Sequence, residues 1–416
     1  MKLKIKILTL IFFAFQIYIY GQNSSTYSRI GIGDILYSYS ASELAIGQLG
    51  SSLTYSGSIN IANPASWTGI NRTRFETSLT YSGLYISDNS TNQFNGKAQF
   101  NGFTLGFPIS DSNGIGLTLG LVPYSLISYK VIGNENYLPA TNDSYQVTYE
   151  GQGGLSKAFM GASYKLPFNL MIGATLEYYF GNLDYTSNAS FSNTTDISTE
   201  YKRIYQPNGL GTTLGIITPD FSPIFNSKSI SNLRIGIALN YISTLSTDTI
   251  LTSSSAVRTD TIGEGTTDMK IPLRLTAGLS FALNQKYIFS LDASSQDWSQ
   301  YSFNGVKSND LRNAVKLSAG FEYRPVVDIS TSNWGQIIWR AGVSYEQTQY
   351  KVDNIGINQF SIAGGFSYPL SYANTIDVAV QYSNRGTKES NLMMEHMVKI
   401  NVGLSLGELW FLRRDE

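Results

Sequence analysis

From residue 73 onward, hydrophobic and polar residues alternate with a period of two, which is typical of β-strands whose two faces meet different surroundings. In the stretch 396–407, valine, isoleucine and leucine on one face alternate with lysine, asparagine, glycine and serine on the other. An even number of such strands can close into an antiparallel barrel with both chain ends on the periplasmic side. The fourteen predicted strands are 73–85, 95–107, 114–124, 153–166, 168–182, 207–218, 231–243, 270–283, 286–298, 310–324, 334–346, 357–368, 374–384 and 396–407.

Charged residues within the predicted strands fall on the polar face. A lysine or arginine facing lipid at mid-depth would cost about 2–4 kcal/mol, so this separation is expected of a barrel that crosses a membrane. A soluble β-sandwich also alternates, but the N-terminal sequence and the connection lengths favour the barrel. The charged residues assigned to the interior are Arg74, Glu76, Glu177, Arg234, Arg274, Asp292, Lys316, Glu322, Arg324, Arg340, Glu346, Asp377 and Lys399.

The connections between predicted strands alternate in length. Polar stretches at 126–152, 183–206 and 244–269 are expected to be long outer loops, while several other connections span only a few residues, as in outer-membrane barrels. The connection after the sixth strand (PDFSPIFNSKS) is expected to hold a short periplasmic helix or turn. Rings near strand ends indicate an interfacial girdle, with saccharide or base stacking as the alternative. They are Tyr81, Tyr124, Tyr164, Tyr178, Tyr241, Trp298, Trp339, Tyr345, Tyr368, Tyr382 and Trp410.

The N-terminal residues 1–21 have the pattern of a secretory signal peptide, with three lysines before an apolar run of about 15 residues. The formal net charge is −1, which gives no reason to expect nucleic acid as a partner. The chain has no cysteine and a single histidine, His396, so we expect neither a metal nor another cofactor. A Ser/His hydrolase would have to use His396, whose ordinary alternative is a solvated loop residue, and we do not expect an enzyme.

Residues 22–72 lack a clear period and end close to the tripeptide Asn63-Pro64-Ala65. A fourteen-stranded barrel is wider than its own side chains can fill, so the lumen must hold water or a plug. The sequence therefore predicts an all-β chain in three parts: a signal peptide at 1–21, a hatch or plug at 22–72, and a transmembrane barrel at 73–416.

The segment that ends in Asn63-Pro64-Ala65, followed by fourteen strands, resembles the FadL/TodX outer-membrane transporters of long-chain fatty acids and other hydrophobic compounds. The opening YSRIGIGD and the ending GELWFLRRDE are similar to Bacteroidetes members of this family. The resemblance implies a monomeric outer-membrane barrel in contact with lipid, which binds a hydrophobic small molecule. In such transporters the ligand enters from the outer face, reaches a lumen blocked by the hatch, and leaves sideways where the third strand kinks.

Two groups of residues are candidates for this site. Gly116, Gly120 and Pro123 in the predicted third strand favour a lateral opening, because proline and glycine weaken a ladder; alternatively, Pro123 simply starts the next loop. Four lumen cations, Arg74, Arg234, Arg274 and Arg340, are candidates for binding a ligand carboxylate. Their alternative role is to hold the hatch through a network with Glu76, Glu177, Asp292 and Glu346.

Two functions follow from the resemblance. The first is a passive diffusion channel for hydrophobic molecules such as long-chain fatty acids. The alternative is a FadL-like accessory or shuttle barrel that serves as a subunit of a larger outer-membrane secretion or assembly complex.

Overall fold

The computed structural model describes residues 25–408, apart from 56, 89–91, 139–142, 193–198, 227–228, 256, 326–331 and 372. The expected signal peptide at 1–21, and residues 409–416 with Trp410, lie outside the described residues. No helix in the described part of the chain is long and apolar enough to cross a membrane.

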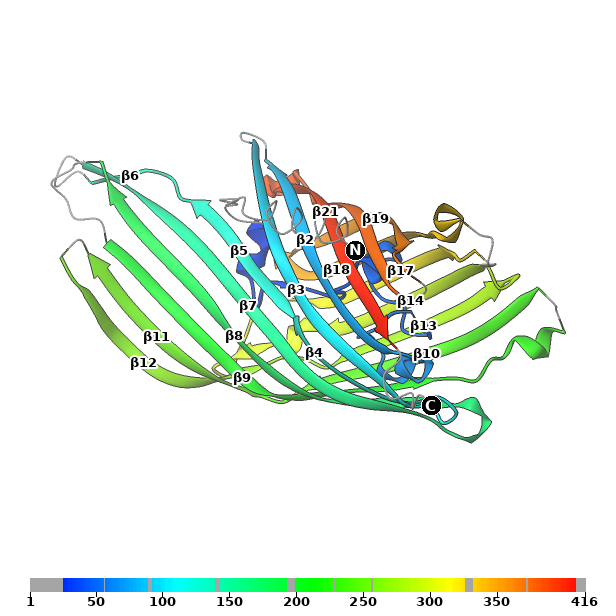
Figure 1. Cartoon of the computed structure of the whole chain (residues 1–416). Helices are drawn as coiled ribbons and strands as arrows, with labels where there is room; N and C mark the ends of the chain where they lie inside the picture. Colours follow the sequence, from blue (N-terminus) through cyan, green and yellow to red (C-terminus); the bar gives the residue numbers. More distant parts are fainter. Residues whose placement is uncertain are drawn as a thin grey trace, which may run out of the picture.

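Long antiparallel strands form the wall, and short elements precede and connect them (Figure 1). The wall strands are β2 (Thr73–Ser87), β3 (Asn92–Ser110), β4 (Ile115–Pro123), β5 (Ser125–Ile132), β6 (Asn136–Leu138), β7 (Asp143–Lys165), β8 (Met171–Phe191), β9 (Thr199–Ile217), β10 (Ile230–Ile242), β11 (Leu245–Ser255), β12 (Thr259–Lys270), β13 (Arg274–Leu283), β14 (Tyr287–Asp297), β17 (Asn313–Tyr323), β18 (Ile338–Val352), β19 (Ile355–Pro369), β20 (Thr375–Gly386) and β21 (Met394–Glu408). The short elements are η1 (Thr26–Arg29), β1 (Asp34–Ile35), α2 (Ala41–Ala45), η2 (Pro64–Gly69), η3 (Pro167–Asn169), η4 (Ser222–Phe225), η5 (Trp298–Gln300), β15 (Ser302–Phe303), β16 (Val306–Lys307), η6 (Asn333–Gln336) and η7 (Glu389–Asn391).

The wall closes because its first strand pairs with its last. β2 is antiparallel to β21 from Thr73↔Glu408 to Ser87↔Met394. Three wall strands are each built from two consecutive elements: β4 with β5, β10 with β11, and β12 with β13. The result is the closed barrel of 14 antiparallel strands that the alternation predicts, so the predicted fold class is confirmed.

The alternation separates an apolar exterior from a polar interior. On β21, Val398 and Val402 are 40% and 46% exposed, whereas Asn401 between them is 3% exposed. Charged wall residues such as Lys316 and Glu322 are buried inside. An apolar outer face around a polar interior is the arrangement that a surrounding bilayer requires, as expected of an outer-membrane barrel.

The stretches expected to be long loops are instead largely strands, so that prediction was wrong. They contain β5, the first half of β7, the end of β8, the start of β9, and the hairpin of β11 and β12. Together these extend one side of the wall far beyond the rest (Figure 1). Both faces of an extension beyond the membrane can meet water, so no apolar face marks it, while threonine and tyrosine still favour strands.

Two rings assigned to the interfacial girdle point inward instead. Tyr124 and Trp298 are 2% and 1% exposed and belong to a buried cluster inside the barrel. Their parity matches that of the inward residues on their own strands, so the alternation itself places them inside. Other predicted girdle rings, such as Tyr178, Tyr241 and Trp339, are exposed on the outer face. The short helix expected after the sixth strand is η4.

Candidate functional site in the lumen

Residues 25–72, which we call the N-terminal segment, bond to inward-facing side chains around the wall. Asp34 Oδ1 accepts a bond from Arg385 Nη1 of β20 at 2.7 Å. Tyr39 donates its hydroxyl to Glu76 of β2 at 2.7 Å. Because these partners lie on different parts of the interior, the segment is held within the lumen.

A carboxylate of β14 binds the turn in the middle of this segment. Asp292 accepts hydrogen bonds from the amides of Gly50 and Ser51 at 3.1 and 2.7 Å, and from the Ser51 hydroxyl at 2.7 Å. Asp292 is 5% exposed. Hydrogen bonds to a charged acceptor are stronger than those between neutral groups, so this contact fixes the turn against the wall.

The tripeptide Asn63-Pro64-Ala65 begins helix η2. The Asn63 side chain accepts a bond from the Ala65 amide at 3.0 Å, and Pro64 occupies the first turn, where its missing N–H has no cost. The Asn63 amide group also donates to the carbonyl oxygens of Ser51, Ile216 and Ile237 at 2.7, 3.2 and 3.3 Å. One side chain therefore joins the helix start, the preceding turn and two wall strands.

Wall glycines make room for the N-terminal segment. Gly173 and Gly215 face each other across the β8–β9 ladder. A Cβ on Gly215 would lie 2.0 Å from Asn63 Oδ1, and one on Gly173 would lie 2.4 Å from the carbonyl carbon of Pro64. Glycine in a strand interior often marks such a close approach. A second pair, Gly236 and Gly278, and a third, Gly320 and Gly342, seat Ser51 and the Ile46-Gly47 peptide in the same way.

The third wall strand departs from its neighbour halfway along. The β3–β4 ladder runs from Ser110↔Ile115 to Phe103↔Leu121. Beyond it, β5 pairs with β7 on one side and with β1 of the N-terminal segment on the other, through Asp34↔Leu126 and Ile35↔Ser125. Within the described residues, no ladder joins β3 to β5. We call this separation the break.

Of the three residues predicted for a lateral opening, two lie within the β3–β4 ladder and one lies at its end, next to the break. Gly116 and Gly120 sit inside the β3–β4 ladder, with Gly116 next to its register shift. A Cβ on Gly116 would approach the Trp67 carbonyl oxygen at 2.8 Å, so this glycine helps to seat η2. Pro123 ends β4 immediately before the break, and β5 starts two residues later, so a strand rather than a loop follows it.

The four candidate arginines do not form one site: two share a cavity, and the other two lie elsewhere. Arg74 and Arg340 line a cavity of about 310 Å³ at the end of the barrel where β2 begins. Arg234 donates to Thr54 of the N-terminal segment at 3.0 Å. The guanidinium of Arg274 lies 5.7 and 5.4 Å from the ring centres of Tyr37 and Tyr124.

The acids expected to bind these arginines mostly have other partners. Arg340 pairs with Glu322 at 2.7 Å, whereas Glu177 pairs with Lys157 at 3.0 Å. In the described part of the chain, no ion pair joins the four arginines to Glu76, Glu177, Asp292 or Glu346.

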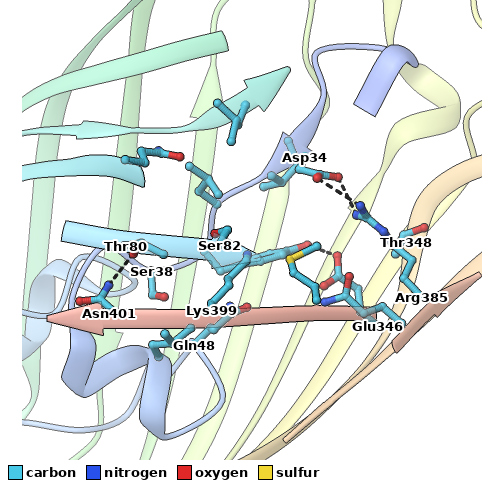
Figure 2. A pocket seen from close by; sticks show the side chains of 18 of the residues that line it. Asp34, Ser38, Gln48, Thr80, Ser82, Glu346, Thr348, Arg385, Lys399 and Asn401 are labelled. Atoms are coloured by element: carbon cyan, nitrogen blue, oxygen red, sulfur yellow. Dashed lines mark hydrogen bonds and ion pairs between the residues drawn. The ribbon is translucent and has the colours of Figure 1, made fainter. Parts of the chain in front are cut away.

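Two further cavities bear on the passage of a ligand. An outer cavity of about 660 Å³ is lined by apolar and aromatic residues and by the charged residues Arg29, Asp310, Lys351 and Asp353; the former are Ile30, Tyr129, Val131, Tyr149, Tyr185 and Val352. A smaller cavity of about 90 Å³ lies beside the break and is lined mainly by polar side chains (Figure 2). Its lining includes Lys97 and Lys399. Sequence reasoning missed Lys97 as a site residue, although it shares its parity with the inward residue Asn101.

Two carboxyls of the N-terminal segment have shifted pKa values. Burial alone would raise the pKa of Asp34, but the Arg385 guanidinium holds it below its ordinary value. Burial raises the pKa of Glu43 to about 8, against hydrogen bonds from the Ile61 and Tyr39 amides. The segment therefore contains one carboxyl whose pKa is lowered by a cation and one whose pKa is raised by burial.

Several solved structures share this architecture. The CymD monoaromatic hydrocarbon channel superimposes with a TM-score of 0.56 at 16% identity, over 91% of this chain and 99% of that chain. A Pseudomonas aeruginosa FadL homologue gives 0.58 at 13% identity, with coverages of 90% and 99%. The Ralstonia pickettii toluene transporter TbuX gives 0.55 at 16% identity, with coverages of 89% and 99%. The predicted resemblance to FadL/TodX barrels is confirmed at the level of the fold.

No curated protein matches the sequence. One family model, described as BamG, matches residues 1–415, which is nearly the whole chain. The chain belongs to the BamG family.

Proposed function

We propose that this barrel is an outer-membrane diffusion channel for hydrophobic molecules, long-chain fatty acids among them. In this proposal the N-terminal segment is the hatch, and the break is a lateral exit into the membrane. The fold is shared with proteins described as a hydrocarbon channel and a toluene transporter, which supports the class of function. The break is the single observation on which the lateral route depends.

The outer cavity fits the entry step. Its volume of about 660 Å³ lies in the range of about 300–1,000 Å³ typical of small-molecule sites. Residues of its lining pack against a large buried apolar cluster that includes Tyr27, Ile32 and Trp298. Removing a CH₂ group from water is worth about 0.8 kcal/mol, so a sixteen-carbon chain gains about 12 kcal/mol by leaving water for such surroundings.

The exit step requires movement of β1. A ladder of two residue pairs, Asp34↔Leu126 and Ile35↔Ser125, joins β1 to the free edge of β5, and η1 is bonded to β5 as well through Ser28. This short ladder covers the break from the lumen side. A ligand that reaches the lumen can leave sideways when β1 separates from β5, while the rest of the segment stays seated on the wall glycines.

Uptake measurements test the proposal. Cells that lack the chain, complemented with it or with an empty vector, are supplied with radiolabelled palmitate and with radiolabelled toluene. We expect the chain to raise the initial uptake rate of at least one of them. Equal rates at matched barrel expression would contradict the proposal.

A second function, as an accessory or shuttle barrel within a larger outer-membrane complex, is favoured by the tight seating of the N-terminal segment. Three pairs of wall glycines hold it, and the cavity beside the break is only about 90 Å³, too small for a long acyl chain. Affinity purification after mild crosslinking separates the two functions. A stoichiometric outer-membrane complex together with unchanged uptake would support the accessory role.

A further inference from the structure

We propose that Lys97, Ser82 and Lys399 form a binding site for the anionic headgroup, phosphate or carboxylate, of a lipid whose acyl chain stays in the membrane at the break. This inference uses the break from the proposed function but concerns binding, and it can hold or fail independently of transport.

The three residues form one row across three neighbouring strands. Ser82 of β2 is the register partner of Lys97 on β3 and of Lys399 on β21. Strands lie about 4.8 Å apart, so the two lysine Cα atoms are about 10 Å apart on the same face, with the serine hydroxyl between them. Flexible lysine side chains span that separation, and both ammonium groups can meet on one anion. Figure 2 shows Lys399 beside Ser82 at the cavity.

The acids that line this cavity are already neutralised. Asp34 pairs with Arg385 at 2.7 Å, and Glu346 pairs with Lys316 at 3.2 Å. Neither the Lys97 nor the Lys399 ammonium group has an ion pair or a side-chain hydrogen bond in the part of the chain that the structure describes. Two positive charges therefore face the cavity without an opposing carboxylate in contact.

The surroundings suit a polar head rather than an acyl chain. The next row of the same wall, Gln99, Thr80 and Asn401, is polar as well, and Asn401 donates to Thr80 at 3.0 Å. The cavity of about 90 Å³ holds a phosphate or carboxylate group but not a long tail. Lys97 lies on the part of β3 that has no described third-strand partner, so a head at this row can keep its tail in lipid outside.

Equilibrium binding to the purified full-length barrel tests this site. The probes are radiolabelled tetradecyl phosphate, tetradecanol and inorganic phosphate, at constant ionic strength. The test variant is Lys97→Gln/Lys399→Gln, and the matched control is Lys130→Gln/Lys202→Gln, which removes two lysines from the outer extension. We expect the test variant to bind tetradecyl phosphate at least tenfold more weakly, with tetradecanol binding unchanged and the control equal to the wild type.

Other outcomes overturn the proposal in distinct ways. Equal affinity of the wild type and the test variant for tetradecyl phosphate means that the lysines bind no headgroup. Inorganic phosphate that binds as tightly as tetradecyl phosphate identifies a free-anion site instead of a lipid site. An equal loss of tetradecanol binding identifies a general packing effect. The single variants Lys97→Gln and Lys399→Gln are the folding control, because native melting temperatures show that the barrel is folded. Toluene uptake, measured separately, reports failure of the transport function.

Discussion

Adding a methyl group at Gly215 should loosen the N-terminal segment without breaking the barrel. A Cβ there would lie 2.0 Å from Asn63 Oδ1 and 2.9 Å from Pro64 Cδ, and Asn63 is fully buried. Overpacking of this kind costs about 1–3 kcal/mol. A displaced Asn63 also loses hydrogen bonds worth about 1 kcal/mol each. We therefore expect Gly215→Ala to lower the free energy of local opening by about 3 kcal/mol, which corresponds to roughly 150-fold.

Hydrogen exchange measured by mass spectrometry on the purified barrel reads this opening directly. Amides whose hydrogen bonds require the segment to stay docked against the wall, such as those of Ile59, Ser66 and Ile70, should exchange about two orders of magnitude faster in Gly215→Ala. The control is Gly364→Ala in β19, where a Cβ would meet only the Arg340 carbonyl oxygen at 3.8 Å. Equal exchange in the wild type and both variants would refute the idea that the glycines seat the segment.

Three further variants probe the lumen. Arg385→Gln leaves Asp34 and Glu395 without the cation that lies 2.7 Å from each. Breaking such a buried pair costs about 3–5 kcal/mol. Protease should therefore cleave the N-terminal segment of the variant faster than that of the wild type. Glu43 ionises near its ordinary pKa when unfolded but near 8 when folded, so the wild-type melting temperature should fall as pH rises across that window, and Glu43→Gln should remove the fall. Trp298→Ala should destabilise the outer cluster by about 3–5 kcal/mol, seen as a lower denaturation midpoint.

The barrel itself could be predicted because the bilayer imposes a face on each strand. Glu177 and Lys316 are inside for the reason that the alternation indicates: a charge on the lipid face is costly. The same parity places Trp298 inside, and the error came from treating a ring near a strand end as interfacial. Where the wall extends on one side, as in β11 and β12, no apolar face marks the strands, and a loop was predicted instead.

The seating of the N-terminal segment could not be predicted from the sequence. Asn63 contacts carbonyl groups more than 150 residues away, at Ile216 and Ile237. Glycine in a strand signals a close approach but does not name what approaches. Pro123 lies at the end of β4, next to the break, whereas the pairing of β5 with β1 depends on two segments that no local pattern connects.

The most direct test of the lateral route is a disulfide between β1 and β5. Ile35 and Ser125 are register partners, at a separation that suits a disulfide, and the chain has no cysteine of its own. The control is a pair within the wall, Thr276→Cys/Ser294→Cys, whose native hydroxyls lie 3.1 Å apart. Oxidation of Ile35→Cys/Ser125→Cys should abolish uptake of labelled palmitate and toluene, and reduction should restore it, while the control pair transports in both states. Unchanged uptake with the β1–β5 disulfide fully formed would contradict a route that requires β1 to leave β5.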